Sequence, residues 1–273
     1  MADVTVIRPR KGWAGLGLGE LWEFRELLWV LAAREVKVRY KQTFLGATWA
    51  VIQPITVMII FTIFFGKLAG LPSDGLPYPV FAFAALLPWG YFSHAMAGAS
   101  GSVIEHRGII SKVYFPRLIL PLAPLLSALV DFGISFLVLA GLMVYYGIVP
   151  SAAAALLPLF VLLAMLSALA LGLWLAALNA HYRDFRYVVP FLLNVAFFAS
   201  PIAYPSSMIR HPVWKALYGL NPMAGVIEGF RWALLRGAPP GPMLWVSTAM
   251  MLALLVSGLA FYRRMERTFV DVV

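Results

Sequence analysis

Six blocks of roughly 20 apolar residues, separated by short polar stretches, dominate this chain. A helix needs about 20 residues to cross a hydrocarbon core of roughly 30 Å. Because lipid offers the backbone no hydrogen-bonding partner, each block is predicted to be a transmembrane α-helix. The predicted spans are residues 46–67, 78–98, 118–147, 154–178, 187–204 and 242–262. The predicted fold class is an all-α integral membrane protein with six transmembrane helices.

Composition supports this interpretation. Of the 273 residues, 62% are hydrophobic and 12% are charged, whereas soluble domains are roughly half apolar and one quarter charged. Sixteen of the 21 lysines and arginines precede residue 42, follow residue 262 or lie in the loops 99–117 and 179–186. The positive-inside rule therefore predicts a multi-pass protein of the cytoplasmic (inner) membrane with both termini in the cytoplasm. The net charge of +9 is explained by this topology and by contact with anionic lipid, so no nucleic-acid partner is predicted.

The N-terminal region divides into two parts before the spans begin. Residues 1–18 form a flexible basic leader, and residues 19–41 are predicted to form an amphipathic helix in the membrane interface, with acidic residues early and basic residues late. The predicted apolar face consists of Leu21, Trp22, Leu28, Trp29, Ala32 and Val36. Residues 42–273 form the six-span domain.

The external segment 205–241 is too apolar and aromatic for a solvated loop. Its apolar residues recur at helical spacing, which predicts two short re-entrant or interfacial helices. Gly219, Asn221 and Pro222 form the predicted break, because Asn-Pro starts turns and proline suits the first position of a helix. The pair Gly225 and Gly229 indicates close packing.

Several kinds of chemistry are missing from the sequence. The chain has no cysteine and its four histidines are scattered, so no metal site and no catalytic residue are predicted. The glycines at positions 15, 17 and 19 are not followed by the Gly-Lys-Ser/Thr of a phosphate loop. Asp131 is the one charge clearly inside a predicted span, either as a proton or substrate contact or as a hydrogen-bonding partner of a neighbouring helix.

Four short motifs carry a family resemblance. The first is RYKQTFLGATWAVIQP, in which Arg39, Tyr40, Leu45, Gly46, Trp49, Gln53 and Pro54 match. The others are KVYFPRLILP at 112–121, NAHYRDFRYV at 179–188 and SPIAYP at 200–205, followed by Asn221 and Pro222. In their order and spacing, these motifs resemble the permease subunits of ABC exporters for O-antigen, capsular polysaccharide and teichoic acid.

The resemblance implies a division of labour between subunits. Two copies of this chain would form a homodimer and join two copies of a separate ATPase, which would hold ATP and Mg²⁺. The cargo would be an undecaprenyl-diphosphate-linked glycan. A drug or small-molecule exporter permease and an ion-coupled transporter remain as alternatives.

The resemblance also suggests site residues. Residues 102–114, in the cytoplasmic loop 99–117, would form a coupling helix against the ATPase, the alternative being an ordinary interfacial loop. The coupling residues are Ile104, Glu105, His106, Arg107, Lys112 and Tyr114. A pair formed by Arg183 and Asp184 would act as a cytoplasmic switch or merely cap helices.

Two further sets concern the cargo. Aromatic rings stack on the apolar faces of sugars, so a channel lining is predicted, although helix packing and interfacial belts explain the same residues. The set is Phe61, Phe64, Phe65, Trp89, Tyr91, Phe92, Phe197, Phe198 and Tyr204. Cations before the first span would bind the lipid diphosphate, unless they only reflect topology. They are Arg34, Lys37, Arg39 and Lys41.

Overall fold

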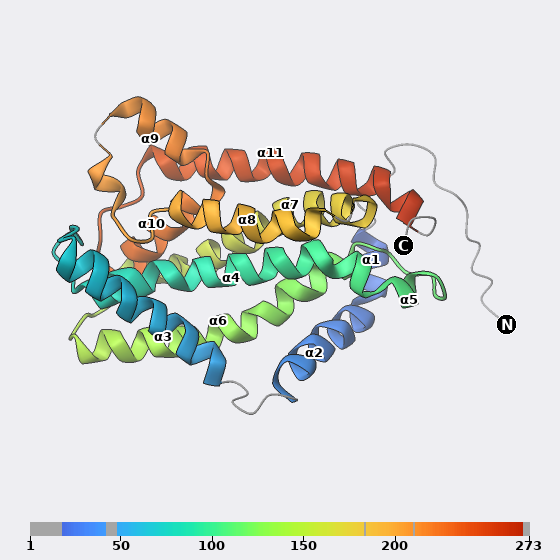
Figure 1. The fold of residues 1–273 in the computed structure, drawn as a ribbon, viewed down its shortest axis with the longest axis horizontal. Coiled ribbons are helices and arrows are strands. Elements are labelled where there is room, and N and C mark those ends of the chain that lie inside the picture. The colour runs from blue at the N-terminus through green and yellow to red at the C-terminus, as the bar shows by residue number, and fades with distance from the viewer. Residues whose placement is uncertain (1–17, 42–47, 183, 210, 270–273) are drawn as a thin grey trace.

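The computed structural model describes residues 18–41, 48–182, 184–209 and 211–269, which form an elongated bundle of helices (Figure 1). The helices are α1 (Leu18–Glu23), α2 (Arg25–Lys41), α3 (Trp49–Phe61), α4 (Tyr78–Glu105), α5 (Arg107–Ile110), α6 (Ile119–Tyr145), α7 (Leu157–His181), α8 (Phe185–Phe198), α9 (Pro212–Gly219), α10 (Pro222–Leu235) and α11 (Pro242–Met265). Within these ranges no residue forms a β-strand. The predicted leader, apart from Leu18, and the motif residues Leu45 and Gly46 lie outside the described residues.

Five helical segments are long and apolar enough to cross a membrane. They are Trp49–Leu68, Tyr78–Glu105, Ile119–Tyr145, Ala152–His181 and Pro242–Thr268, and they coincide with the first four and the last of the predicted spans. The first includes a π-helical segment after α3, the fourth a 3₁₀ turn before α7 and the last a 3₁₀ turn after α11. In place of the predicted span 187–204 stands α8, which has 14 residues and therefore measures only about 21 Å.

The segment around α8 nevertheless connects the two ends of the bundle. At one end, which also holds α1, α2 and α5 and is called the α2 end here, His181 Nε2 lies 2.9 Å from Thr268 Oγ1. At the other, called the α10 end, the Tyr78 hydroxyl donates to the carbonyl of Ala203 at 2.6 Å. The chain therefore passes from one end to the other between His181 and Ala203.

Helix α4 is the centre of the bundle. Over its most apolar stretch 78% of the residues are buried, compared with 11% for the α3 segment. Small residues allow its neighbours to approach closely: a Cβ on Gly98 would lie 2.7 Å from Pro124 Cβ of α6, and a Cβ on Gly172 of α7 would lie 2.7 Å from Ala99 Cβ. Close backbone approach through small residues is typical of helix packing in membranes.

The predicted interface helix is two helices, because the chain breaks at Phe24 between α1 and α2. Leu28, Leu31 and Ala32 pack against the other helices, but Trp22 and Trp29 are 71% and 64% exposed. Trp29 lies on the side of α2 opposite Leu31, and both tryptophans are exposed apolar side chains of the kind that a membrane interface accommodates. The location of these helices in the interface stays a prediction.

The segment 205–241 contains the two short helices that were predicted, α9 and α10, and the break between them is confirmed. Asn221 caps α10 by accepting a hydrogen bond from the Met223 amide at 2.9 Å, and Pro222 occupies the first turn. A Cβ added to Gly225 or Gly229 would come within 2.2 Å of Ser247 or Phe160, respectively. The two glycines therefore allow α10 to pack tightly against α11 and α7.

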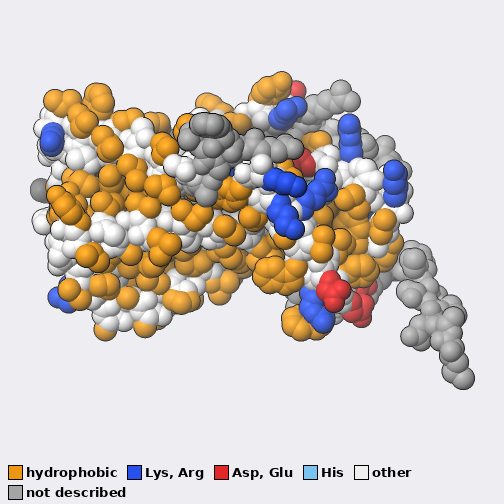
Figure 2. All heavy atoms as spheres, turned by 90° about the horizontal axis from the view of Figure 1, so that it is seen from below, with side chains coloured by type: hydrophobic (Ala, Val, Ile, Leu, Met, Phe, Trp, Pro, Cys, Tyr) orange, Lys and Arg blue, Asp and Glu red, His pale blue; other side chains and the backbone are white. Residues whose placement is uncertain are grey.

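Charge is concentrated at the α2 end. In Figure 2, lysine and arginine side chains gather toward that end, while hydrophobic side chains cover most of the remaining surface. This is the distribution that a bundle exposed to lipid along most of its length requires.

Candidate functional site

Three of the four cations predicted to bind a lipid diphosphate lie together on the exposed side of α2. Arg34, Lys37 and Lys41 are exposed and, with Val30, Ala33 and Val38, line a shallow depression of about 490 Å³. Val30 and Val38 are each 62% exposed. Cations interleaved with exposed apolar side chains are the combination that a headgroup region accommodates.

The fourth cation, Arg39, points to the protein instead. Its guanidinium and the hydroxyl of Tyr40 both donate to the carboxylate of Asp131 on α6. One turn earlier, the Ser127 hydroxyl donates to the Glu35 carboxylate at 2.7 Å. Each helix supplies contacts four residues apart, so α2 and α6 share two layers of polar contact, which we call the α2–α6 seam. Of the two interpretations of Asp131, this geometry matches the contact with a neighbouring helix.

Burial alters the titration of the seam. Desolvation, followed by the hydrogen bond to Asp131, raises the pKa of Tyr40 to about 12. Desolvation also raises the pKa of Glu35, although the hydrogen bond from Ser127 and the nearby His106 and Arg39 oppose it. Tyr40 therefore remains a hydrogen-bond donor at neutral pH.

The predicted coupling segment is not one helix. Residues 102–105 complete α4, and only Arg107–Ile110 form a separate helix, α5. Glu105 and Arg107 are exposed, Ile104 is half-buried, and His106 is buried with Nδ1 2.9 Å from the carbonyl of Ser102. His106 therefore stabilises the turn between α4 and α5, and little of its side chain is accessible to a partner.

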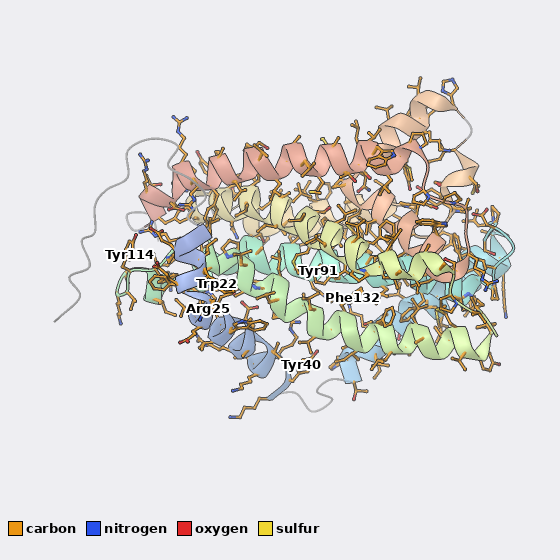
Figure 3. The ribbon with its side chains drawn as sticks, turned by 180° about the vertical axis from the view of Figure 1, so that it is seen from behind. Trp22, Arg25, Tyr40, Tyr91, Tyr114 and Phe132 are labelled. Atoms are coloured by element: carbon orange, nitrogen blue, oxygen red, sulfur yellow. The ribbon has the colours of Figure 1, made fainter. Side chains whose placement is uncertain are left out.

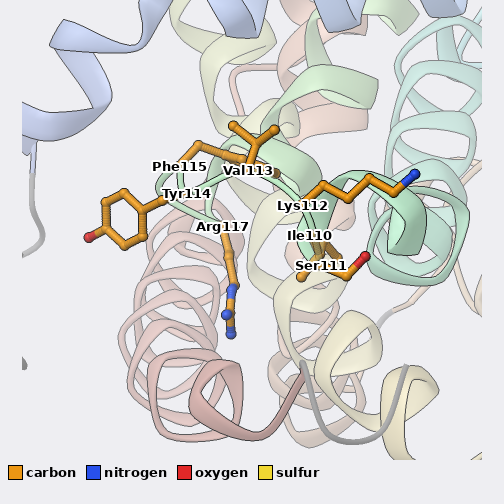
Figure 4. A pocket seen from close by; sticks show the side chains of 7 residues that line it. All are labelled: Ile110, Ser111, Lys112, Val113, Tyr114, Phe115 and Arg117. Carbon is orange, nitrogen blue, oxygen red and sulfur yellow. The ribbon is translucent and has the colours of Figure 1, made fainter.

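The loop that follows α5 is exposed at its tip and anchored at its base. Lys112 and Tyr114 are exposed and line a depression of about 280 Å³ (Figure 4). The residues that line this depression are Ile110, Ser111, Lys112, Val113, Tyr114, Phe115 and Arg117. At the base, Phe115 is buried, the Arg117 guanidinium donates to the carbonyl of Glu266, and the Tyr262 hydroxyl donates to the carbonyl of Arg117 at 3.0 Å. These contacts hold the loop against the C-terminal end of α11. They could not be predicted from the motif KVYFPR alone.

The predicted ion pair between Arg183 and Asp184 has one member outside the described residues, Arg183. Asp184 is exposed and occupies the position before α8 without a side-chain capping bond. Its carbonyl accepts from the amide of Tyr187 at 2.9 Å. The ion pair stays a prediction.

Six of the nine predicted aromatic residues form one continuous set of ring contacts. The ring centroids lie 5.0 Å apart for Phe61–Phe65, 5.7 Å for Phe61–Phe197, 5.6 Å for Trp89–Phe197, 5.3 Å for Trp89–Phe92 and 5.4 Å for Phe197–Phe198. We call these residues the aromatic cluster. It joins α3, α4 and α8.

The other three aromatic residues lie elsewhere. The Tyr91 ring packs 5.9 Å from Phe132 inside the bundle (Figure 3). Phe64 is 56% exposed, and Tyr204 accepts a hydrogen bond from the Tyr218 hydroxyl at 3.0 Å. Within the cluster, Phe61, Trp89 and Phe92 are buried and Phe198 is exposed. In this conformation the aromatic cluster is a packed contact between three helices.

Sequence reasoning missed the buried charge at the α10 end. Arg231 belongs to the predicted external segment 205–241, yet it is 3% exposed and stacks on the Phe81 ring at 3.6 Å. Its guanidinium donates to the carbonyl of Ile202 at 2.8 Å and lies 3.3 Å from the Glu228 carboxylate. We call these contacts the Arg231 clamp. The Glu-x-x-Arg spacing within the apolar run was the available signal.

Potential metal ligands are dispersed. Within the described ranges, no three histidine or acidic side chains come together in a way that would hold a metal ion.

Comparison with known proteins adds independent information. A family profile described as ABC-2 type transporter matches residues 26–235. The O-antigen export system permease protein RfbA of Myxococcus xanthus is 34% identical over 214 residues, which cover 78% of this chain and 81% of that protein. An RfbA of Klebsiella pneumoniae is 26% identical over 91% of this chain and 95% of its own. The polysialic acid transport protein KpsM of Escherichia coli is 26% identical over 86% of this chain and 92% of its own.

Proposed function

This chain belongs to the ABC-2 type transporter family, and from that membership we propose that it is the permease subunit of an ATP-driven polysaccharide exporter. It is a multi-pass membrane protein. The proposal is carried by one observation: relatives that match it over most of their length have names that specify O-antigen export or polysialic acid transport. The proposed cargo is a polyprenyl-diphosphate-linked glycan, with O-antigen, capsule and teichoic acid as the candidate types.

The proposed topology has six crossings of the cytoplasmic membrane. Helix α8 and the residues up to Ala203 would complete the fifth crossing, since they join opposite ends of the bundle. The α2 end, with its cations, would face the cytoplasm, which places both termini there. Helices α9 and α10 would then form a re-entrant segment opening to the outside, and α1 and α2 would lie in the cytoplasmic interface.

Energy would come from a partner ATPase that binds ATP and Mg²⁺. The exposed side chains of Glu105, Arg107, Lys112 and Tyr114 surround α5 at the α2 end, and they offer both charge and an aromatic anchor to a partner. The Tyr262 hydroxyl of α11 donates to the carbonyl of Arg117 at the loop base, so a force applied at α5 would reach the helix bundle. Two copies of this chain would assemble with two ATPase subunits.

The cargo headgroup would meet α2. Arg34, Lys37 and Lys41 lie on one exposed surface, and cations of this kind bind phosphate oxygens through charge-assisted hydrogen bonds. Replacing the three with glutamine is expected to raise the glycan concentration needed for half-maximal ATPase stimulation, while the maximal rate is retained.

The decisive experiment measures ATP hydrolysis by this chain co-purified with the proposed partner ATPase, with and without added polyprenyl-diphosphate glycan. Stimulation by the glycan is expected, and it should be lost in Glu105→Ala and Arg107→Ala. Glu23→Ala, an exposed carboxylate on α1, is the matched control and should leave stimulation intact.

Other outcomes separate the alternatives. Transport of a small molecule with no response to glycan would contradict the polysaccharide cargo and favour a drug exporter. Transport by this chain without any ATPase would contradict the whole proposal and favour an ion-coupled carrier.

A further inference from the structure

The residues that follow α11 are packed into the bundle at the α2 end. Helix α11 ends at Met265, a 3₁₀ turn covers Glu266–Thr268, and Phe269 comes next. Figure 1 shows the end of α11 at the same end of the bundle as α1 and α5. Phe269 is 0% exposed, and its ring centroid lies 5.3 Å from that of Tyr262 on α11 and 6.1 Å from that of His181 on α7. We call the residues from Glu266 to Phe269 the 266–269 turn.

The 266–269 turn is attached to the α5 loop, which is the segment between α4 and α6. The Arg117 guanidinium donates to the carbonyl of Glu266, and the Tyr262 hydroxyl donates to the carbonyl of Arg117 at 3.0 Å. In Figure 4 the Arg117 side chain extends from the loop toward α11. Phe115 of the loop and Phe269 of the turn belong to the same buried apolar cluster. Hydrogen bonds and apolar packing together therefore hold the base of the α5 loop against the turn.

The same turn is attached to the end of α7. His181 Nε2 lies 2.9 Å from Thr268 Oγ1, and His181 Nδ1 lies 3.1 Å from the carbonyl oxygen of Ala177. Helix α8 begins at Phe185, whose ring centroid lies 6.3 Å from that of Tyr182. Because an extended chain spans at most about 3.6 Å per residue, so short a connection limits how far the start of α8 can separate from His181. A displacement of the turn would therefore reach the start of α8.

Helix α8 is only lightly embedded in the bundle. Val189 is the one buried residue among the 14 residues of this helix, whereas most of α4 is buried. Segments with few buried contacts move at a lower free-energy cost than the packed core does. Helix α8 is therefore suited to respond to a displacement delivered at its start.

We propose that the 266–269 turn is a positioning element that joins the α5 loop to the start of α8, so that a movement imposed on α5 displaces α8. The inference rests on the proposed function, in which the partner ATPase imposes that movement. The turn contacts the α5 loop through Arg117 and the end of α7 through His181. Closely packed and hydrogen-bonded groups transmit strain because they cannot move independently of one another.

Two variants loosen the turn to different degrees. Phe269→Ala removes the buried ring, while Thr268→Val keeps the shape of its side chain and removes only the hydroxyl beside His181. Phe269→Leu is the conservative variant, because it returns an apolar side chain to the same site. Arg264→Gln, at an exposed position in the last turn of α11, is the matched control. Each variant is reconstituted in lipid nanodiscs with the partner ATPase.

Phe269→Ala is expected to reduce the glycan stimulation of ATP hydrolysis at least about fivefold, the lower end of typical coupling effects. The hydrolysis rate without glycan, the glycan concentration for half-maximal stimulation and the affinity for the ATPase should remain unchanged. Thr268→Val should reduce stimulation by a smaller factor, and Phe269→Leu should restore most of what Phe269→Ala loses. Full stimulation in Phe269→Ala would overturn the proposal. A loss that excess ATPase restores would also overturn it, since the turn would then serve only to dock the ATPase.

Hydrogen exchange separates joining from general destabilisation, and it needs no ATPase. In Phe269→Ala, exchange should become faster both in the α5 loop and at the start of α8, and it should remain unchanged in α10. Faster exchange throughout the chain would assign Phe269 to overall stability, and faster exchange in one of the two segments would show that the turn does not join them. Either result contradicts the proposal. If the native chain shows no ATPase association or no glycan response, the proposed function fails, and the exchange pattern still decides whether the turn joins the two segments.

Discussion

Helices α10 and α2 carry charge in opposite ways. Eleven of the 14 residues of α10 are buried, Arg231 among them, whereas only Leu31 and Ala32 are buried among the 17 residues of α2. In α10 the cation is satisfied by a ring, a carbonyl and a carboxylate within the chain. In α2 most cations face outward. The comparison indicates that Arg231 in α10 stabilises the fold, while the cations of α2 that face outward are accessible to ligands and partners.

The largest effect should follow from breaking the Arg231 clamp. Arg231→Met leaves the Glu228 carboxylate and the Ile202 carbonyl without their partner, and removing one member of a buried pair costs about 3–5 kcal/mol. Thermal unfolding in detergent should show a large drop in midpoint. Lys215→Met, at an exposed position of α9, should leave the midpoint unchanged. A tolerated Arg231→Met would mean that α10 is held by apolar packing alone.

The next effect concerns packing of the same helix. Gly229→Ala forces a methyl group against the Phe160 ring, and overpacking of this kind costs about 1–3 kcal/mol. Gly133→Ala on α6, where a Cβ meets nothing within 4 Å, should be neutral or slightly stabilising. Equal midpoints for the two variants would contradict the tight contact of α10 with α7.

A smaller and more local effect is expected at the α2–α6 seam. Asp131→Asn removes the charge that Arg39 and Tyr40 contact, and a hydrogen bond to a charged group contributes about 1.5–3 kcal/mol. Because Arg39 is partly exposed, water can replace part of the lost hydrogen bonding, and the loss of stability should be smaller than this figure. Hydrogen exchange should increase in α2 and remain unchanged in α10. Faster exchange in both helices would show that the two regions are not independent.

The smallest effect is a pH dependence. Burial raises the pKa of Glu35 above its ordinary value, so the folded protein holds this proton more strongly than the unfolded chain does. The contribution of Glu35 to stability is therefore largest at low pH and falls as pH rises from the unfolded pKa through the folded one.

Glu35→Gln should flatten this fall in stability as pH rises above the ordinary glutamate pKa, and it retains an acceptor for the Ser127 hydroxyl. The exposed Glu26→Gln is the control. A profile of Glu35→Gln that still falls with pH in the same way would assign the dependence to another group.

The sequence allowed more of the fold than of the site to be predicted. Apolar block length placed the starts of the five long helices within three residues, because lipid imposes one requirement on every span. Two of them extend beyond their predicted ends, to Glu105 and Thr268. The predicted span 187–204 extends past the end of α8, because the apolar run continues into the motif SPIAYP. Proline in that motif prevents the helix from continuing. The Asn221–Pro222 break was predictable because capping is local chemistry.

Pairing was harder to predict. From the sequence, the same role was predicted for Arg34, Lys37, Arg39 and Lys41. Arg39 donates to Asp131 only because α6 lies beside α2 in the folded structure. Likewise, the buried state of Arg231 depends on Phe81 and Ile202, which are remote in sequence.

The sequence by itself determined that this chain is a helical membrane protein, where most of its helices begin and end, and which family it resembles. These follow from hydropathy and local propensity, which act over one or two turns. The tertiary structure decided which face of each helix is packed and which charges are neutralised within the chain. Those features depend on helices brought together from positions far apart in the chain, and no local pattern encodes the distance between them.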